Sequence, residues 1–419
     1  MTAGLLLVLP SLSAVYAQPG SAYPFINRNA NVVEFFGDSK NHWQSFCRIL
    51  DTLFLSGDGS LDILHLGDSH VQADIFPHEL RKGFQGFSPG MVNARGFVFP
   101  YPVAKTNNPE NYKVTYTGTW NRCRSVTKYE GCSFGIAGIN IQTLDSVSTI
   151  TIRPNLTASD TYLTNSIKIF RNFDSGDFLI NLLNYQGEVT YYNDTLNGFT
   201  ALTISEYLQD VEFQFIRCDT LKNPFIIYGF ILDNDLNGIT YHTAGLNGAE
   251  IPSFNRCEFF GNDLRQINPG LVIISLGAND AGGPNLFISD FRKSLETLID
   301  KIRSSGENPL ILLTTPGDAY RRSRYHNTHV PQIGKVIHEV ASEKGLAVWD
   351  YYTVMGGAKS VYQWYRNGLA QKDKLHLTRK GYQLQGQLLF EALMKAYTRS
   401  HQAENQPELL INTDLPQSN

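Results

Sequence analysis

The sequence contains few cysteines, few methionines and little charge. Only five of its 419 residues are cysteine and four are methionine, and charged residues make up 18% of the chain. Five cysteines in a chain of this length are too few for a disulfide-stabilised scaffold. The net charge of −4 provides no general attraction for phosphate backbones, so we expect no nucleic acid partner. No apolar run is long enough to cross a bilayer, and we therefore expect no stable membrane insertion.

Apolar and aromatic residues are plentiful by contrast. The hydrophobic fraction is 42%, with 25 Phe, 21 Tyr and 35 Gly. This composition excludes a disordered or fibrous protein and predicts a sizeable core. The abundance of Phe, Tyr and Gly indicates many strands and turns beside helices. A chain of this length is typical of two or three domains.

The N-terminal segment has the pattern of an export signal. Residues 5–15 form a short apolar run with Pro10 inside it, and Ala17 follows at the small-residue spacing of signal peptidase sites. This resembles a secretory signal spanning residues 1–17, although no Lys or Arg precedes the apolar run. A buried N-terminal strand is the alternative. An export signal would place the mature protein in the periplasm or outside the cell.

The cysteine and histidine spacings contain no metal-binding motif. Cys123 and Cys132 are near enough in sequence to pair, but an odd number of cysteines leaves at least one thiol outside any pairing within the chain. No Cys-x-x-Cys occurs, and we expect no metal site. His326 and His329 form a His-x-x-His without an obvious third ligand, which we interpret as part of a solvated loop.

Two kinds of hydrophobic pattern divide the chain. Residues 61–66 are a predicted buried strand, and residues 271–276 form an almost unbroken apolar run, typical of a central strand in a parallel sheet. A predicted helix follows each of them. Residues 148–152 and 211–215 instead alternate apolar and polar side chains, as half-buried antiparallel strands do. We therefore predict an α/β fold with helices on both faces of a parallel sheet, interrupted by an inserted β-sandwich.

These patterns predict a domain plan. Residues 18–97 and 240–400 would form the two parts of the α/β domain, and residues 98–239 would form the insert. The segment from Val71 to Phe84 should form one helix after the first buried strand. The polar tail, residues 401–419, is expected to be disordered.

Residues suited to acyl transfer occur at four points in the chain. Ser69 follows a predicted buried strand, where a helix begins, although a simple helix cap is the alternative for it. Asp373 and His376 lie three residues apart, so the carboxylate could orient the imidazole and the imidazole could take a serine proton. Gly248 and Asn279 follow strands and could stabilise an oxyanion together with the Ser69 backbone N–H. Taken separately, each is also an ordinary turn or cap residue.

The order of these blocks resembles the SGNH, or GDSL, hydrolase superfamily over residues 45–96 and 240–398. The resemblance implies a three-layer, flavodoxin-like α/β domain that needs neither cofactor nor metal. It implies Ser69 as the nucleophile, His376 as the base and Asp373 as the partner of the base. It also implies an oxyanion hole formed by Ser69, Gly248 and Asn279.

A narrower resemblance concerns the sequence around the serine. Residues 67–74 read Gly-Asp-Ser-His-Val-Gln-Ala-Asp, with His70 where most relatives have Leu. Together with residues 349–370 and 377–382, this segment looks like the bacterial peptidoglycan O-acetylesterases. Members of that branch carry a β-sandwich similar to a carbohydrate-binding module at the place of the insert. Asp280 stands where we expect Glu in that branch.

The resemblance implies an exported serine esterase that removes O-acetyl groups from a polysaccharide, with peptidoglycan as the first choice. A lipase, lysophospholipase or thioesterase with the same site is an alternative, and a non-catalytic glycan-binding protein is another. We predict that the insert positions the glycan beside the site and is dispensable for hydrolysis of small esters. The alternative is that it braces the α/β domain.

Overall fold

The computed structural model describes residues 23–87, 92–127, 131–155, 162–174, 176–220, 223–306 and 308–404. The segment that resembles an export signal, residues 1–17, lies outside these ranges. Within them, no helix combines the length and apolar character needed to cross a membrane.

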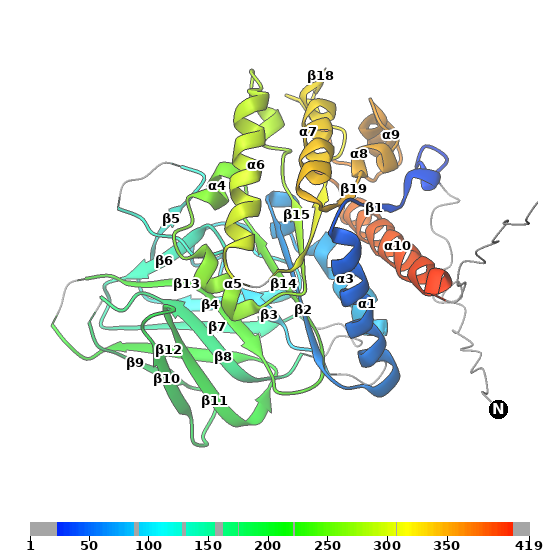
Figure 1. Cartoon of the computed structure of the whole chain (residues 1–419). Coiled ribbons are helices and arrows are strands. Elements are labelled where there is room, and N and C mark those ends of the chain that lie inside the picture. Colours follow the sequence, from blue (N-terminus) through cyan, green and yellow to red (C-terminus); the bar gives the residue numbers. More distant parts are fainter. Residues whose placement is uncertain are drawn as a thin grey trace, which may run out of the picture.

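A six-stranded sheet forms the centre of the α/β part (Figure 1). The strand order is β1 (Val33–Phe35), β19 (Ala347–Trp349), β16 (Leu310–Thr314), β15 (Leu271–Ser275), β2 (Ser60–Gly67) and β14 (Gly238–Gly245). All neighbours pair in parallel except β1, which runs antiparallel to β19 at one edge. The carboxyl ends of the five parallel strands therefore meet at one edge of the sheet.

Helices cover both faces of this sheet because successive strand residues point to opposite sides. Ile63 and Ile273 pack with the core of α1 (Ser39–Ser56), α3 (Ile75–Phe87) and α10 (Arg379–Glu404). Leu64 and Ile274 pack on the other side. The helices there are α4 (Ile251–Asn255), α5 (Phe260–Ile267), α6 (Ile288–Arg303) and α7 (His329–Lys344). The shorter helices are α2 (Ser69–Gln72), α8 (Tyr351–Met355), α9 (Ser360–Arg366), η3 (Arg28–Ala30) and η4 (Asp280–Gly282).

The insert consists of two antiparallel sheets, coloured cyan to green in Figure 1. The larger sheet contains β10 (Thr190–Asp194), β11 (Phe199–Leu208), β8 (Thr164–Arg171), β13 (Phe225–Asp233), β6 (Ile139–Thr143) and β5 (Asn121–Arg124), with β3 (Gly96–Val98) also paired to β13. The smaller sheet contains β4 (Tyr112–Thr117), β7 (Val147–Pro154), β12 (Val211–Arg217) and β9 (Phe178–Leu182). The rings of Phe213 and Phe230 stack 5.2 Å apart between the sheets. The predicted fold class, an α/β domain interrupted by a β-sandwich, is confirmed.

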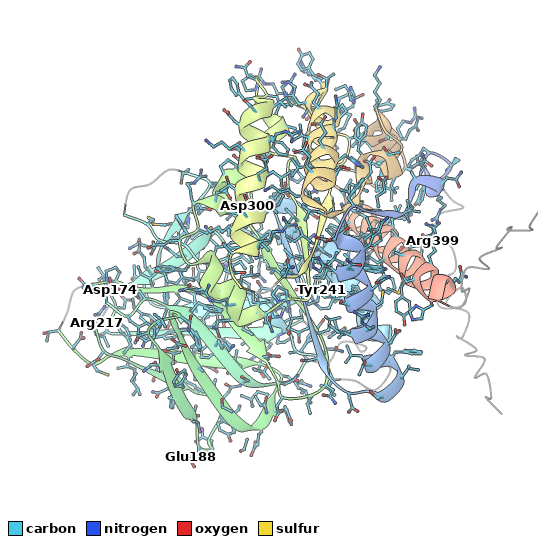
Figure 2. All side chains as sticks on the ribbon, viewed as in Figure 1. Asp174, Glu188, Arg217, Tyr241, Asp300 and Arg399 are labelled. Carbon is cyan, nitrogen blue, oxygen red and sulfur yellow. A yellow bond between two sulfur atoms is a disulfide. The ribbon has the colours of Figure 1, made fainter. Side chains whose placement is uncertain are left out.

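The insert shares its core with the α/β part. One cluster of buried side chains runs from the sandwich to the α4–α7 face of the parallel sheet, so no polar layer separates the two. Tyr241 of β14 lies in the middle of the molecule, whereas Glu188 marks the outer end of the insert (Figure 2). This continuity favours the bracing role. The boundaries of the insert at 98 and 239 stay a prediction. In the structure, Gly96 already pairs with a strand of the antiparallel sheet, and Gly238 already pairs with a strand of the parallel sheet.

The expected helix from Val71 to Phe84 is in fact broken. Asp74 adopts a left-handed backbone conformation, with φ of 52°, between α2 and α3. Its buried carboxylate pairs with Arg81 at 3.2 Å and with Arg95 at 2.5 Å. Burial alone would raise the pKa of Asp74, but the two guanidinium groups hold it below its usual range. Sequence spacing contains no sign of this buried ion cluster.

The predicted start of the disordered tail, residue 401, is wrong. Helix α10 continues to Glu404. His401 contacts Asp51 of α1 at 3.0 Å, which anchors the last turn. Residues 405–419 lie outside the described part of the chain. Cys123 and Cys132, which the sequence showed only to be near enough to pair, form a disulfide in the insert.

Candidate active site

Ser69 lies at the carboxyl end of a central strand. Strand β2 ends at Gly67, and a Cβ at Gly67 would approach Val71 to 2.2 Å, so the tight turn requires glycine. Asp68 is the cap of α2, because its Oδ1 accepts from the His70 N–H at 2.9 Å. Ser69 is therefore the first helical residue, and the alternative that it merely caps the helix is not supported.

Tertiary folding brings Asp373, His376 and Ser69 into one line of hydrogen bonds. Ser69 Oγ lies 3.1 Å from His376 Nε2, across 307 residues of sequence. His376 Nδ1 lies 2.7 Å from Asp373 Oδ2. A carboxylate that holds Nδ1–H leaves Nε2 as an acceptor for the serine proton, which is the geometry of an acyl-transfer triad.

A tight turn holds the carboxylate of Asp373 in place. Its Oδ1 accepts from the backbone N–H groups of Leu375 at 3.0 Å and His376 at 3.1 Å. Burial alone would raise the pKa of Asp373, but these bonds and the bond to the His376 ring outweigh it, so the pKa lies below the usual range. The Asp373 carboxylate therefore stays ionised at neutral pH.

A second histidine packs against His376, and the roles assigned from sequence do not include it. The His70 ring stacks on the His376 ring with centroids 5.3 Å apart, and Tyr382 Oη lies 2.8 Å from His70 Nδ1. Burial lowers the pKa of His70, and the nearby His376 lowers it further, against the raising effect of Asp68. The resemblance had pointed to His70 and Tyr382 as characteristic residues but had suggested no chemistry for them.

Asn279 reaches the same site from the end of β15. Its Nδ2 donates to Ala249 O at 3.0 Å and to Asp68 Oδ2 at 3.2 Å. Its side chain makes no capping bond to η4, so the cap alternative is not supported. Both amide hydrogens already face acceptors, and a bond to a substrate oxygen would have to be shared with one of them.

The loop of Gly248 is held by both α2 and the insert. Gly248 has φ of +79°, and a Cβ there would meet no described atom within 4 Å, so its backbone is open to a ligand. The preceding Asn247 donates its N–H to Gln72 at 2.7 Å and its side-chain amide to Thr106 at 3.2 Å. Arg124 of β5 also donates to the Asn247 carbonyl.

Asp280 is buried below this loop. Its Oδ1 accepts from the Ile251 N–H at the start of α4, at 3.2 Å, and its Oδ2 has no partner within the described part of the chain. Burial raises the pKa of Asp280 to about 7. The carboxyl group helps to place α4 behind Gly248.

The interpretation of His326 and His329 as a solvated loop is wrong. His326 lies in β18 (Tyr325–His326) and contacts the buried Asp318 at 2.7 Å, while His329 begins α7 and approaches Ala281 O at 3.3 Å. The His-x-x-His pattern does not itself contain Asp318, and the fold places this residue beside His326. Within the described ranges, no cluster of three or more His, Cys, Asp or Glu residues could hold a metal.

The fold and the site resemble those of SGNH/GDSL-type acylhydrolases, which are carboxylic ester hydrolases. Residues 224–384 match the GDSL-like Lipase/Acylhydrolase family, a range that contains Gly248, Asn279, Asp373 and His376. Ser69 lies outside the match because the insert separates it from the other blocks in sequence.

Among solved structures, one described as a peptidoglycan O-acetylesterase in action matches 88% of this chain and 99% of its own, with 21% identity and a TM-score of 0.69. This likeness extends over the insert as well as the α/β part, and it shows the fold. A lipase/acylhydrolase from Enterococcus faecalis matches 39% of this chain and 77% of its own, with 28% identity and a TM-score of 0.30. None of the curated proteins matches the sequence significantly.

Proposed function

We propose that this chain is an exported serine esterase that removes O-acetyl groups from a glycan, with peptidoglycan as the favoured substrate. The observation that carries the proposal is the chain of hydrogen bonds from Asp373 through His376 to Ser69, at 2.7 and 3.1 Å. The solved structure that resembles this chain over 88% of its length bears the description of a peptidoglycan O-acetylesterase, which supports the substrate.

In this proposal the reaction proceeds through an acetyl-serine. Ser69 Oγ attacks the acetyl carbonyl carbon while His376 Nε2 takes its proton. Collapse of the tetrahedral intermediate breaks the ester bond, and the sugar oxygen leaves with the proton from His376. Water then attacks the acetyl-serine and gives a proton to His376. Acetate departs, and Ser69 regains its proton.

The oxyanion of each tetrahedral intermediate would bind three donors. These are the backbone N–H groups of Ser69 and Gly248 and the side-chain amide of Asn279. Ser69 is the first residue of α2, so its N–H has no acceptor within that helix. The open backbone at Gly248 and the position of Asn279 beside Asp68 support the same assignment.

Two further observations bear on the acyl group and on export. A cavity of about 40 Å³ beside the triad, lined in part by Asp68, His70 and Leu375, has room for a small group. The disulfide in the insert supports export, because disulfides persist in oxidising compartments.

Hydrolysis of three ester substrates tests the proposal. We expect the purified chain to release acetate from O-acetylated peptidoglycan, more slowly from acetylated xylan, and to cleave a long-chain ester poorly. Ser69→Ala and His376→Ala should each abolish all three reactions while leaving the circular dichroism spectrum unchanged. Preference for the long-chain ester, or near-wild-type turnover by either variant, would overturn the proposal.

A further inference from the structure

A groove of about 550 Å³ opens beside the candidate active site. It begins at Asn279 and Leu375, which belong to the site, and continues along the hairpin of β17 (Tyr320–Arg321) and β18 (Tyr325–His326). Leu375 lies between Asp373 and His376 in the chain. A substrate whose acetyl ester lies at Ser69 can therefore extend into this groove.

The lining of the groove is cationic and aromatic. Arg321 and Arg322 line it together with Tyr320 and Tyr325, and no carboxylate is among its described lining residues. Asp280, next to Asn279 in the chain, does not line the groove, although its Oδ2 has no partner among the described residues, and two other acids close to lining residues in the chain already have partners. Asp318 lies buried against His326 at 2.7 Å, and Asp373 is bound to His376. The positive charge of the two arginines is thus not cancelled by a partner in the groove.

The tip of the hairpin is built in an unusual conformation. Arg322 and Ser323 both have positive φ, 50° and 59°, at turn positions where glycine or asparagine is the usual choice. Lys374, next to Asp373, fixes the tip by donating Nζ to Ser323 O at 2.8 Å. The turn is therefore held against the triad loop, and Arg322 is held at the groove.

The two arginines differ in how much of their donor capacity is used. Arg321 donates Nη1 to Gly283 O at 3.0 Å, while its buried Nε has no partner among the residues that the structure describes. Arg322 is exposed at the rim. An arginine with free donors is suited to a carboxylate, which it can bind through two parallel hydrogen bonds.

We propose that this groove binds a carboxylate group of the acylated glycan, with Arg322 as the main contact. The proposal rests on the proposed function and narrows it. The substrate would be an O-acetylated glycan that bears carboxylates, from acidic sugars or from attached peptides, in preference to a neutral one. Arg322 would then determine specificity and would take no part in the chemical step.

The test compares Arg322→Gln with a matched control, Arg324→Gln. Both changes remove one positive charge from the same turn, but Arg324 does not line the groove. The substrates are O-acetylated peptidoglycan, the same polymer after its carboxyl groups have been converted to neutral amides, and p-nitrophenyl acetate. The small ester reports whether each variant is folded and has an intact catalytic site.

We expect Arg322→Gln to raise KM for the native polymer about tenfold, as loss of a charge-assisted hydrogen bond does, with kcat within twofold. Arg324→Gln should stay within twofold of wild type, and both variants should cleave p-nitrophenyl acetate normally. Amidation of the polymer should raise the wild-type KM and remove the difference between wild type and Arg322→Gln.

Two results separate this proposal from the proposed function. If wild type releases acetate equally from native and amidated polymer, and Arg322→Gln behaves as Arg324→Gln does, the groove has no carboxylate specificity while the esterase function stands. If wild type releases no acetate from either polymer but cleaves long-chain esters, both proposals are overturned.

Discussion

The hydrogen bonds of Asn279 limit the roles that its side chain can have in the site. Its amide is held by Ala249 and Asp68, and it makes no cap to the helix that follows. Removing one oxyanion donor typically lowers kcat by about 10² to 10³-fold. We therefore expect Asn279→Ala to lower kcat by about that factor in steady-state hydrolysis of p-nitrophenyl acetate, with little change in KM. An unchanged kcat with a raised KM would reassign Asn279 to substrate binding.

The His70 ring packs against a face of the His376 ring, and Tyr382 in turn holds His70. Tyr382→Phe removes the 2.8 Å bond to His70 Nδ1 but keeps the ring. We expect kcat to fall roughly tenfold, because a misplaced base is a less effective one, and KM to stay within twofold. The check is a pH–rate profile alongside the steady-state constants. A structural role alone would leave kcat unchanged and lower only the melting temperature.

At the scale of elements, the break between α2 and α3 depends on one buried carboxylate. Asp74 pairs with Arg81 and Arg95, and all three side chains are almost fully buried. Asp74→Ala would leave two buried guanidinium groups without their counter-ion, which costs about 3–5 kcal/mol. We expect that loss in urea unfolding at pH 7. The control, Asp58→Ala in the exposed loop before β2, should stay within about 0.5 kcal/mol of wild type.

Helix α5 carries a second buried acid, Asp263, whose contribution to stability changes with pH in the direction opposite to that of Asp74. Burial raises the pKa of Asp263 to about 7, although its Oδ2 accepts from the Ile136 N–H at 2.7 Å. Because the pKa of Asp263 is higher in the folded than in the unfolded chain, its protonated carboxyl group stabilises the fold. This contribution is complete below the unfolded pKa of about 3.9 and is lost as the pH rises through 7. Asp263→Asn should therefore reduce the loss of stability between pH 5 and 7 by about 1.4 kcal/mol per pH unit. Urea unfolding at several pH values measures it.

A pH dependence in Asp263→Asn as steep as that of wild type would contradict the assignment. Asp280, whose pKa also lies near 7, should keep part of the slope in the variant. Both pKa values are raised because each carboxyl group loses hydration in the fold, and the backbone N–H groups of Ile136 and Ile251 compensate for this only in part.

At the scale of the whole molecule, the shared core predicts that the insert and the α/β part unfold together. Trp43, Trp349 and Trp364 belong to the α/β core, and Cys218 is an exposed free thiol in the insert. In Trp120→Phe, tryptophan fluorescence reports the α/β part, and a dye on Cys218 reports the insert. We expect one urea midpoint for both probes. Two midpoints would show that the insert is an independent unit.

The same continuity bears on removal of the insert. Replacing residues 100–237 with a short Gly/Ser linker would expose the apolar side chains of the α/β part that pack against the insert, and would remove Thr106 and Arg124 from the Gly248 loop. This differs from the sequence-based hypothesis that the insert is dispensable for small esters. We expect the shortened chain to aggregate, so that neither p-nitrophenyl acetate nor glycan is cleaved.

The sequence by itself determined the alternation of strands and helices, the β-rich insert, and the junctions at which Ser69, Gly248, Asn279 and the Asp373–His376 pair occur. These are local properties, since hydrophobic period and turn chemistry are read over a few residues. The approach of Ser69 to within 3.1 Å of His376 was expected only through resemblance to a family.

Only the tertiary structure decided which distant residues became neighbours. It placed Ser69 beside His376, Tyr382 beside His70, and the arginine hairpin beside Asn279. It also joined the insert to the α/β core and broke a helix at Asp74 to bury an ion cluster. Each depends on which faces pack together and on where buried charge finds a partner. Those energies arise between residues far apart in the chain, so no local pattern encodes them.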